Sequence, residues 1–278
     1  MRPPLLTATV AAAMQSARQS GRRSLVCSLD LQRSETTIEI DVTCWRAHGI
    51  EYPYLETCRD RTICYWDGAA FASVSRYSSA LIKLVPTEWG PPTFEIDGIK
   101  MLPTAKVSPY ADAGRKVHLI RPGGKRILDT CGGLGYFAAW CLAGGAASVQ
   151  SFEKHADVLW LRSLNPWSPA PDERHVLSHA DITQQIGELP HASFDAILHD
   201  PPRFGIAGEL YSKSFYAQLA AVLKPGGSMF HYTGAPNRLT SGRDVSNEVA
   251  QRLGAVGFRT RVEGDGILAV LAARNATR

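Results

Sequence analysis

The pattern of apolar and polar positions divides this chain of 278 residues near residue 105. Before that point, short alternating runs are separated by turn residues such as Asp67-Gly68, which is typical of β-strands. These runs cover residues 24–31, 37–42, 62–66 and 79–85. An alanine-rich apolar stretch over 5–14 precedes them and predicts a helix that runs to about Arg22. We therefore expect an N-terminal accessory domain over 1–105, a helix followed by β-structure.

From about residue 110 onward, strand-like apolar runs alternate with helical patterns, which predicts an α/β fold with a doubly wound, mostly parallel sheet. A helix is expected over 209–223. The last two strand-like runs, 258–263 and 266–272, are joined by Gly264-Asp265 and predict an antiparallel hairpin that closes the sheet edge. Residues 106–278 should therefore form a Rossmann-like catalytic domain.

The first strand of this second domain leads into a glycine-rich turn. The apolar run that ends in Asp129 is followed by this turn, by a helix-like stretch over 136–142 and by a second strand that ends in Glu153. Gly133 and Gly135 allow the backbone to turn tightly and to approach a ligand, and the following helix N-terminus favours an anionic group. Glu153 follows Asp129 by 24 residues, where an acid can accept both hydroxyls of a ribose.

Acids after the next two strands indicate which nucleotide is bound. Asp181 follows the third strand, and Asp200-Pro201-Pro202 follows the fourth. These are features of S-adenosylmethionine (SAM) enzymes of the class I methyltransferase fold, and they favour SAM over a nicotinamide cofactor. Asp181 is expected to face the adenine amino group, Glu153 the ribose, and the glycine turn the methionine end. The expected SAM contacts are Asp129, Cys131, Gly133, Gly135, Tyr136, Glu153, Lys154, Asp181, Ile182 and Asp200.

Longer motifs resemble one particular group, the uncharacterised predicted methyltransferases found mainly in archaea. The matching strings are FEIDGIKM at 94–101, LDTCGGLGY at 128–136, LNPWS at 164–168, HDPPRF at 199–204, AGELYS at 207–212 and FHYTG at 230–234. The resemblance covers residues 83–270 and implies the fold and the SAM cofactor, but no substrate. Cys131 replaces the first glycine of the usual turn, as in that group. Leu102-Pro103 stands where the group has a basic His-Arg pair, which counts against an anionic substrate such as RNA.

The candidate catalytic residues are Asp200, Pro201, Arg203, Tyr211 and Tyr232. Asp-Pro-Pro looks like the motif with which amino-directed methyltransferases hold a planar amine through a side-chain oxygen and a backbone carbonyl; the alternative is a stiff loop after a strand. Arg203 either binds a carboxylate or pairs with an acid such as Glu209. Tyr211 should lie near the pocket. Tyr232 either holds a sulfonium by cation–π attraction or packs in the core.

Other polar residues have structural interpretations. His179 and His199 precede strand-end acids and point the opposite way in regular strands, so both are expected to be buried. Asn165 is either a helix cap or a substrate ligand. The six cysteines contain no Cys-x-x-Cys pair and are expected to be reduced thiols, with no metal site.

Composition narrows the possible partners. The net charge is +4 from 30 basic and 26 acidic residues, without the basic stripe of a typical nucleic-acid binder. A small-molecule substrate is therefore favoured over RNA. No run has the length of a transmembrane helix, so no membrane partner is expected. Because a SAM enzyme needs the compartment where SAM is made, the expected location is the cytoplasm. The oligomeric state stays open.

Three functional hypotheses follow. The first is SAM-dependent methylation of a nitrogen in a small molecule or nucleobase, which Asp200-Pro201-Pro202 favours. The second is attack by an amine on the SAM side-chain carbon, which releases methylthioadenosine; its intramolecular form closes the ring of azetidine-2-carboxylate, and a cage of Tyr136, Tyr211 or Tyr232 would suit it. The third is a non-catalytic SAM-binding subunit.

Overall fold

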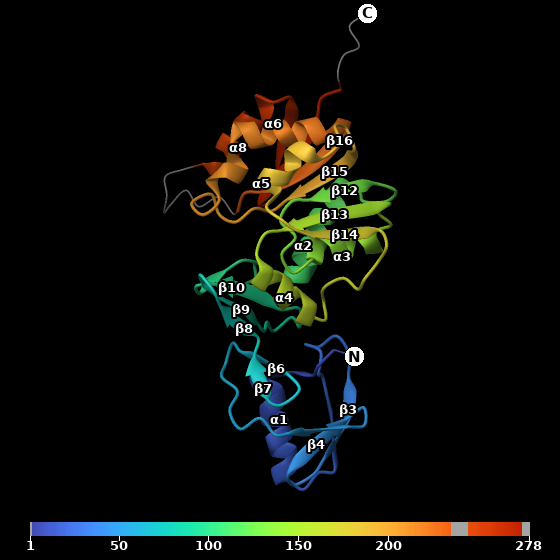
Figure 1. Ribbon diagram of the computed structural model, residues 1–278, viewed down its shortest axis with the longest axis vertical. Helices are drawn as coiled ribbons and strands as arrows, with labels where there is room; N and C mark the ends of the chain where they lie inside the picture. The colour runs from blue at the N-terminus through green and yellow to red at the C-terminus, as the bar shows by residue number, and fades with distance from the viewer. Residues whose placement is uncertain (1, 235–243, 274–278) are drawn as a thin grey trace, which may run out of the picture. The chain divides into compact units, whose positions relative to one another are not determined.

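The computed structural model describes residues 2–234 and 244–273 (Figure 1). The chain divides into two compact units. Unit 1 comprises residues 1–112 and 160–168, and unit 2 comprises residues 113–159 and 169–278. The sequence analysis expected a boundary near residue 105, whereas the first division between these units falls after residue 112. The sequence analysis also did not predict that residues 160–168, far along the sequence, are part of unit 1.

The N-terminal part of unit 1 consists of a short strand, one helix and then short antiparallel strands, so the sequence pattern predicted the helix and the β-structure but not the first strand. Its elements are β1 (Leu5–Thr7), α1 (Ala8–Gln19), β2 (Ser24–Cys27), β3 (Thr36–Ile40), β4 (Cys44–Ala47), β5 (Ile50–Pro53), β6 (Ile63–Trp66), β7 (Phe71–Ser73), β8 (Ser75–Tyr77), β9 (Leu81–Val85), β10 (Thr93–Ile96) and β11 (Ile99–Lys100). They form three small sheets with the orders β1-β6-β7, β2-β3-β4-β5 and β11-β10-β9-β8. The sequence did not predict the β4–β5 hairpin, whose turn residues His48 and Gly49 both have positive φ.

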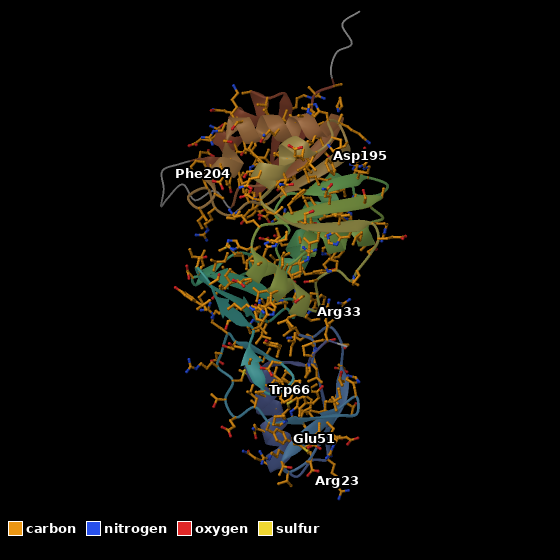
Figure 2. The ribbon with its side chains drawn as sticks, in the orientation of Figure 1. Arg23, Arg33, Glu51, Trp66, Asp195 and Phe204 are labelled. Carbon is orange, nitrogen blue, oxygen red and sulfur yellow. The ribbon has the colours of Figure 1, made fainter. Side chains whose placement is uncertain are left out.

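Aromatic side chains form part of the core of unit 1. Trp45 is fully buried and stacks on Tyr52, with 4.5 Å between ring centroids. Phe71 and Trp66, the latter labelled in Figure 2, complete the cluster against these rings. Such a cluster buries a large apolar area, so it stabilises the unit.

Unit 2 is built on a seven-stranded sheet with the order β14-β13-β12-β15-β16-β18-β17. The strands from β14 to β16 are parallel, whereas β18 is antiparallel to both β16 and β17. This arrangement confirms the predicted α/β fold, including the closing hairpin. The strands are β12 (Arg126–Asp129), β13 (Ser148–Glu153), β14 (His175–His179), β15 (Phe194–His199), β16 (Leu223–Tyr232), β17 (Phe258–Glu263) and β18 (Gly266–Leu271).

Helices cover both faces of this sheet, as Figure 1 shows for α6 and α8 on one side and for α2 and α3 on the other. Helices α5, α6 and α8 share one hydrophobic core with the strands. On the other side α2 approaches α3 closely, because a Cβ at Gly114 would lie 2.7 Å from the Trp140 ring. The helical elements are α2 (Pro109–Ile120), α3 (Tyr136–Ala143), α4 (Ala156–Leu164), α5 (Ile182–Gln185), η1 (Ile186–Glu188), η2 (Gly208–Tyr211), α6 (Lys213–Val222) and α8 (Val245–Gly254).

The helix expected over 209–223 is two elements. Residues of η2 form a short 3-10 turn, and α6 begins only after Ser212. Ser212 has extended backbone angles, and its hydroxyl accepts a hydrogen bond from the Phe215 backbone N–H at 3.1 Å. A serine in this position starts a helix by satisfying a free N–H group. The apolar spacing over 209–223 therefore spans two separate helical elements.

Two histidines are buried side by side in the sheet. His199 on β15 and His231 on β16 are register partners with ring centroids 4.4 Å apart. His199 Nε2 donates to the Leu210 carbonyl at 3.0 Å, which leaves Nδ1 to accept from the Thr130 hydroxyl at 2.7 Å. The burial predicted for His199 is therefore confirmed. His179 is exposed, and that prediction was wrong because β14 is an edge strand with little cover.

The histidine pair should make the fold sensitive to acid. Burial lowers the pKa of His199 to about 4, and burial together with His199 lowers the pKa of His231 well below its ordinary range. The unfolded chain binds these protons near pH 6.5, so stability is present above that pH and is lost as the pH falls from 6.5 toward 4. His199 alone should reduce the free energy of unfolding by about 2 kcal/mol between about pH 7.5 and 5.

Urea unfolding of the wild type and of His199→Gln at several pH values measures this effect. The glutamine keeps a donor for the Leu210 carbonyl and does not titrate, so its pH dependence should be smaller. If the wild type had the same free energy of unfolding at about pH 7.5 and at about pH 5, the histidine pair would not be neutral and buried.

Candidate active site

The carboxyl ends of the parallel strands in unit 2 bring most of the predicted site residues together. Figure 2 labels Asp195 near the start of β15 and Phe204 in the loop after its end, so the two residues mark the amino and carboxyl sides of the sheet. Asp129, Glu153 and Tyr232 end their strands, and Asp200 follows β15 directly. Open α/β sheets bind ligands at this edge.

The glycine turn and Glu153 are joined by hydrogen bonds. Gly133 and Gly135 have φ values of 47° and 82°, which side chains with a Cβ rarely adopt. The Gly133 backbone N–H donates to Glu153 Oε2 at 3.0 Å, and the His155 N–H donates to Oε1 at 2.9 Å. The Glu153 carboxylate is thus fixed against the turn, next to the N-terminus of α3.

Asp129 lies deeper than a direct ligand. Its side chain is completely buried, and the Ser151 hydroxyl donates to its Oδ2 at 2.8 Å. This bond links the ends of β12 and β13 beneath the turn. We therefore assign Asp129 a supporting position. Tyr136, the first residue of α3, is also buried.

The surroundings of Cys131 show that three acids converge. The pKa of its thiol is raised well above its usual range, first by burial and then by the charges of Glu153, Asp129 and Asp200. This direction agrees with the sheet order, in which β12 lies between β13 and β15, so that the acids at the ends of these strands flank Cys131. Residues from three strand ends therefore surround the turn.

Asp181 begins α5. Its Oδ1 accepts hydrogen bonds from the Thr183 N–H at 2.9 Å and from the Thr183 hydroxyl at 2.7 Å. The ammonium group of Lys154 lies 3.9 Å from its Oδ2, and Ile182 packs into the sheet core. The predicted adenine side of the site thus consists of the helix-capping Asp181, of Lys154, which pairs with it, and of the buried Ile182.

The loop after β15 is held by Tyr211. Pro201 is buried, and the hydroxyl of Tyr211 donates to the Pro202 carbonyl at 3.1 Å. Burial, followed by the charges of Asp200, Cys131 and Tyr232, raises the pKa of Tyr211. Tyr211 is therefore a buried support for the Asp-Pro-Pro loop. Its neutral hydroxyl is already used as a donor.

Arg203 is exposed in the same loop. Within the described ranges, 2–234 and 244–273, no ion pair joins it to Glu209. The Ile206 N–H donates to the Arg203 carbonyl at 2.7 Å, so the backbone of this residue closes the turn. Its side chain faces solvent.

Lys116 is a site residue that sequence reasoning missed. Its side chain is 2% exposed, and its ammonium nitrogen lies 3.9 Å from Asp200 Oδ2 and 3.9 Å from Asp265 Oδ2. It also lies 3.9 Å from the centroid of the Tyr232 ring. The aromatic face expected for a sulfonium thus contacts the chain's own cation. The available signal was spacing, because Lys116 shares one helical face with the apolar residues Ala113, Val117 and Ile120.

The LNPWS motif at 164–168 lies in unit 1 and has structural contacts. Asn165 is completely buried, and its Oδ1 accepts from the Trp167 N–H at 3.1 Å. The indole N–H of Trp167 donates to the Leu31 carbonyl at 2.9 Å, and Arg2 donates to the Asn165 carbonyl at 2.9 Å. These bonds support the cap interpretation of Asn165 and tie the motif to the N-terminal segment.

In the ranges 2–234 and 244–273, no group of three or more His, Cys, Asp or Glu side chains could hold a metal ion. All six cysteines are free. Among the same described residues, no helix combines the length and the apolar character needed to cross a membrane.

Comparisons with known proteins identify the fold. No family model matches the chain. An uncharacterized protein of Methanocaldococcus jannaschii is 42% identical over 195 residues, which cover 69% of this chain and 66% of that protein, just under two thirds of its length. A spermidine synthase bound to a transition-state analogue has a TM-score of 0.58 at 19% identity, over 71% of this chain and 72% of that one.

Two further solved structures have a similar fold. The spermidine synthase of Thermotoga maritima has a TM-score of 0.55 at 17% identity, over 71% of each chain. A probable spermidine synthase of Corynebacterium glutamicum has a TM-score of 0.51 at 15% identity, over 73% of this chain and 82% of that one. At this level of identity the likeness concerns the fold alone. The chain has the class I methyltransferase fold, which spermidine synthases share.

Proposed function

We propose that the protein is a SAM-dependent transferase that methylates a nitrogen atom of its acceptor. The observation that carries this proposal is that Glu153, the Gly133 turn and Asp200 lie at or just after the carboxyl ends of the neighbouring strands β13, β12 and β15, with Glu153 hydrogen-bonded to the turn. An acid bound to a glycine turn suits an adenosyl group, and an acid beside it suits the group that is modified.

The residues present fit SAM. The positive φ values of Gly133 and Gly135 leave a backbone without Cβ atoms where a ligand would lie against the turn. Glu153 has oxygen atoms that can accept ribose hydroxyls in addition to the two N–H groups they already bind. Asp181, which caps the N-terminus of α5 by accepting a hydrogen bond from the Thr183 N–H, has a carboxylate that can accept a further hydrogen bond from an exocyclic amino group. SAM supplies a methyl group activated by a positively charged sulfur.

Asp200 is the group that we assign to the acceptor. Its side chain is 19% exposed, and the buried Pro201 and the Tyr211–Pro202 bond fix the loop that carries it. The nitrogen lone pair forms the new N–C bond while the S–C bond breaks and leaves its electron pair on sulfur. The displaced N–H proton passes to Asp200 or to solvent. Alignment of the two reacting atoms supplies much of the rate in such a step.

A small molecule in the cytoplasm is the proposed acceptor. The net charge of +4 is low for a protein that binds RNA, and Leu102-Pro103 replaces the basic pair of the resembling group. A nucleobase within RNA is the less favoured acceptor.

The cyclisation hypothesis is less favoured by the site. It calls for an aromatic cage around the sulfonium, but the Tyr232 ring contacts Lys116, and Tyr136 and Tyr211 are buried. The similarity to spermidine synthases concerns the fold alone, so it does not distinguish the two reactions. A binding subunit without activity would not need Asp200 beside the cofactor site.

Product identity tests the proposed function. The purified protein is incubated with SAM alone and with SAM plus a small-molecule extract of cells, and the adenosyl products are separated by chromatography. We expect S-adenosylhomocysteine that depends on the extract. Methylthioadenosine from SAM alone would overturn methyl transfer and support cyclisation. SAM binding without either product would support the binding subunit.

A further inference from the structure

A buried cation lies across the strand ends where the acceptor is proposed to bind. The ammonium group of Lys116 is 3.9 Å from the carboxylate of Asp200, from that of Asp265 and from the centre of the Tyr232 ring. Asp200 follows β15, Tyr232 ends β16, and Asp265 directly precedes β18. These three strands are neighbours in the sheet, so the lysine contacts one continuous patch.

A second cation of α2 pairs with one of these carboxylates. Arg115, next to Lys116 on α2, places its guanidinium 2.7 Å from Asp265 Oδ1. Asp265 thus pairs with both Arg115 and Lys116, and Asp200 pairs with Lys116. Burying an unpaired ammonium costs several kcal/mol, so the two acids stabilise Lys116 in place. The same pairing cancels the negative charge that Asp200 and Asp265 would otherwise offer to a ligand.

We propose that Lys116 determines the acceptor class: it admits an uncharged, planar nitrogen and excludes alkylammonium groups. This inference rests on the proposed function, in which Asp200 faces the acceptor. A second cation near Asp200 meets like-charge repulsion from Lys116, and the Tyr232 face that would attract it is already in contact with a cation. An alkylammonium must also lose a proton before its nitrogen can attack. A neutral planar amine has its lone pair available and donates an N–H to Asp200.

Calorimetry with a simple diamine tests this exclusion. The probe is 1,4-diaminobutane, titrated at neutral pH into protein saturated with S-adenosylhomocysteine. The wild type should give no binding up to about 10 mM, and Lys116→Met should bind the diamine at least about tenfold more tightly, since removal of the like charge leaves Asp200 and Asp265 in excess. Lys116→Arg keeps the charge and should behave as the wild type. Lys224→Met, which removes a lysine paired with Asp195 near the amino end of β15, is the matched control.

Failure of this inference can be distinguished from failure of the proposed function. Titration of S-adenosylhomocysteine alone reports whether the cofactor site exists in each variant, and it does not depend on the diamine. Diamine binding by the wild type with a dissociation constant below about 10 mM would overturn the inference. So would a folded Lys116→Met protein that binds the cofactor product but gains no affinity for the diamine. If Lys116→Met does not fold, Lys116→Gln removes the same charge with a polar side chain and is judged by the same criteria.

Discussion

Glu153→Ala is expected to weaken SAM binding at least about 100-fold without unfolding the protein. The carboxylate fixes the Gly133 turn through one hydrogen bond, and in the proposed SAM site it would accept both ribose hydroxyls. Hydrogen bonds to charged groups contribute about 1.5–3 kcal/mol each, and two of them correspond to a change of at least about 100-fold in affinity. Loss of the partner for the Gly133 N–H adds to the effect.

Calorimetric titration with SAM measures this change. Glu173→Ala is a matched control, because Glu173 is exposed and lies two residues before β14, at the amino side of the sheet. Its affinity for SAM should equal that of the wild type. A Glu153→Ala protein that binds SAM within about threefold of the wild type would show that the adenosyl group lies elsewhere.

Asp200→Asn is expected to lower the rate of transfer at least about 100-fold while SAM affinity changes little. Hydrogen-bonding and proton-accepting groups at a reacting nitrogen contribute typically about 10²–10⁴-fold. Asparagine keeps the size of the side chain and removes its charge, so the loop held by Pro201 and Tyr211 should stay in place. The measurement is the rate of S-adenosylhomocysteine formation with cell extract, together with SAM titration.

Asp195→Asn provides the comparison for this variant. Asp195 lies on the same strand near its amino end and pairs with Lys224 at 2.6 Å, so its loss should affect stability more than transfer. Equal rates in Asp200→Asn and in the wild type would remove Asp200 from the proposed chemistry. An equal fall in both variants would indicate a general effect of β15.

Much of unit 2 could be predicted from the sequence because its chemistry lies at strand ends. Asp129 and Glu153 end apolar runs, and glycines follow the first of them, so the pattern gives both the strand boundaries and the place of the turn. The hairpin around Gly264-Asp265 was predictable for the same reason. Local sequence signals were sufficient wherever the turn residues were distinctive.

The features that escaped prediction either have an unusual local signal or depend on contacts between distant residues. The β4–β5 turn uses His48-Gly49 in place of a more familiar turn pair, and Ser212 interrupts a continuous apolar stripe. His179 lies on a strand whose position at the sheet edge cannot be read from its own residues. The role of Lys116 depends on Asp200 and Asp265, which are distant in the sequence.

Tyrosines illustrate the limit for side-chain roles. The sequence predicted that Tyr211 and Tyr232 lie near the pocket; in the structure Tyr211 contacts the loop after Asp200, and Tyr232 shares Lys116 with Asp200. Their partners decide what they do: Tyr211 donates to a backbone carbonyl, and Tyr232 carries a lysine on its ring. The Tyr211 contact is made to a backbone atom, which no side-chain motif reveals. The Tyr232 contact is made to Lys116, which lies more than a hundred residues earlier in the sequence.

Direct titration of the purified protein with SAM is the most immediate test of the cofactor site. Convergence of Glu153, the glycine turn and Asp181 predicts one SAM molecule per chain with a dissociation constant on the order of 1–100 μM, and competition by S-adenosylhomocysteine. The absence of heat and of any thermal stabilisation by SAM at millimolar concentration would contradict the account.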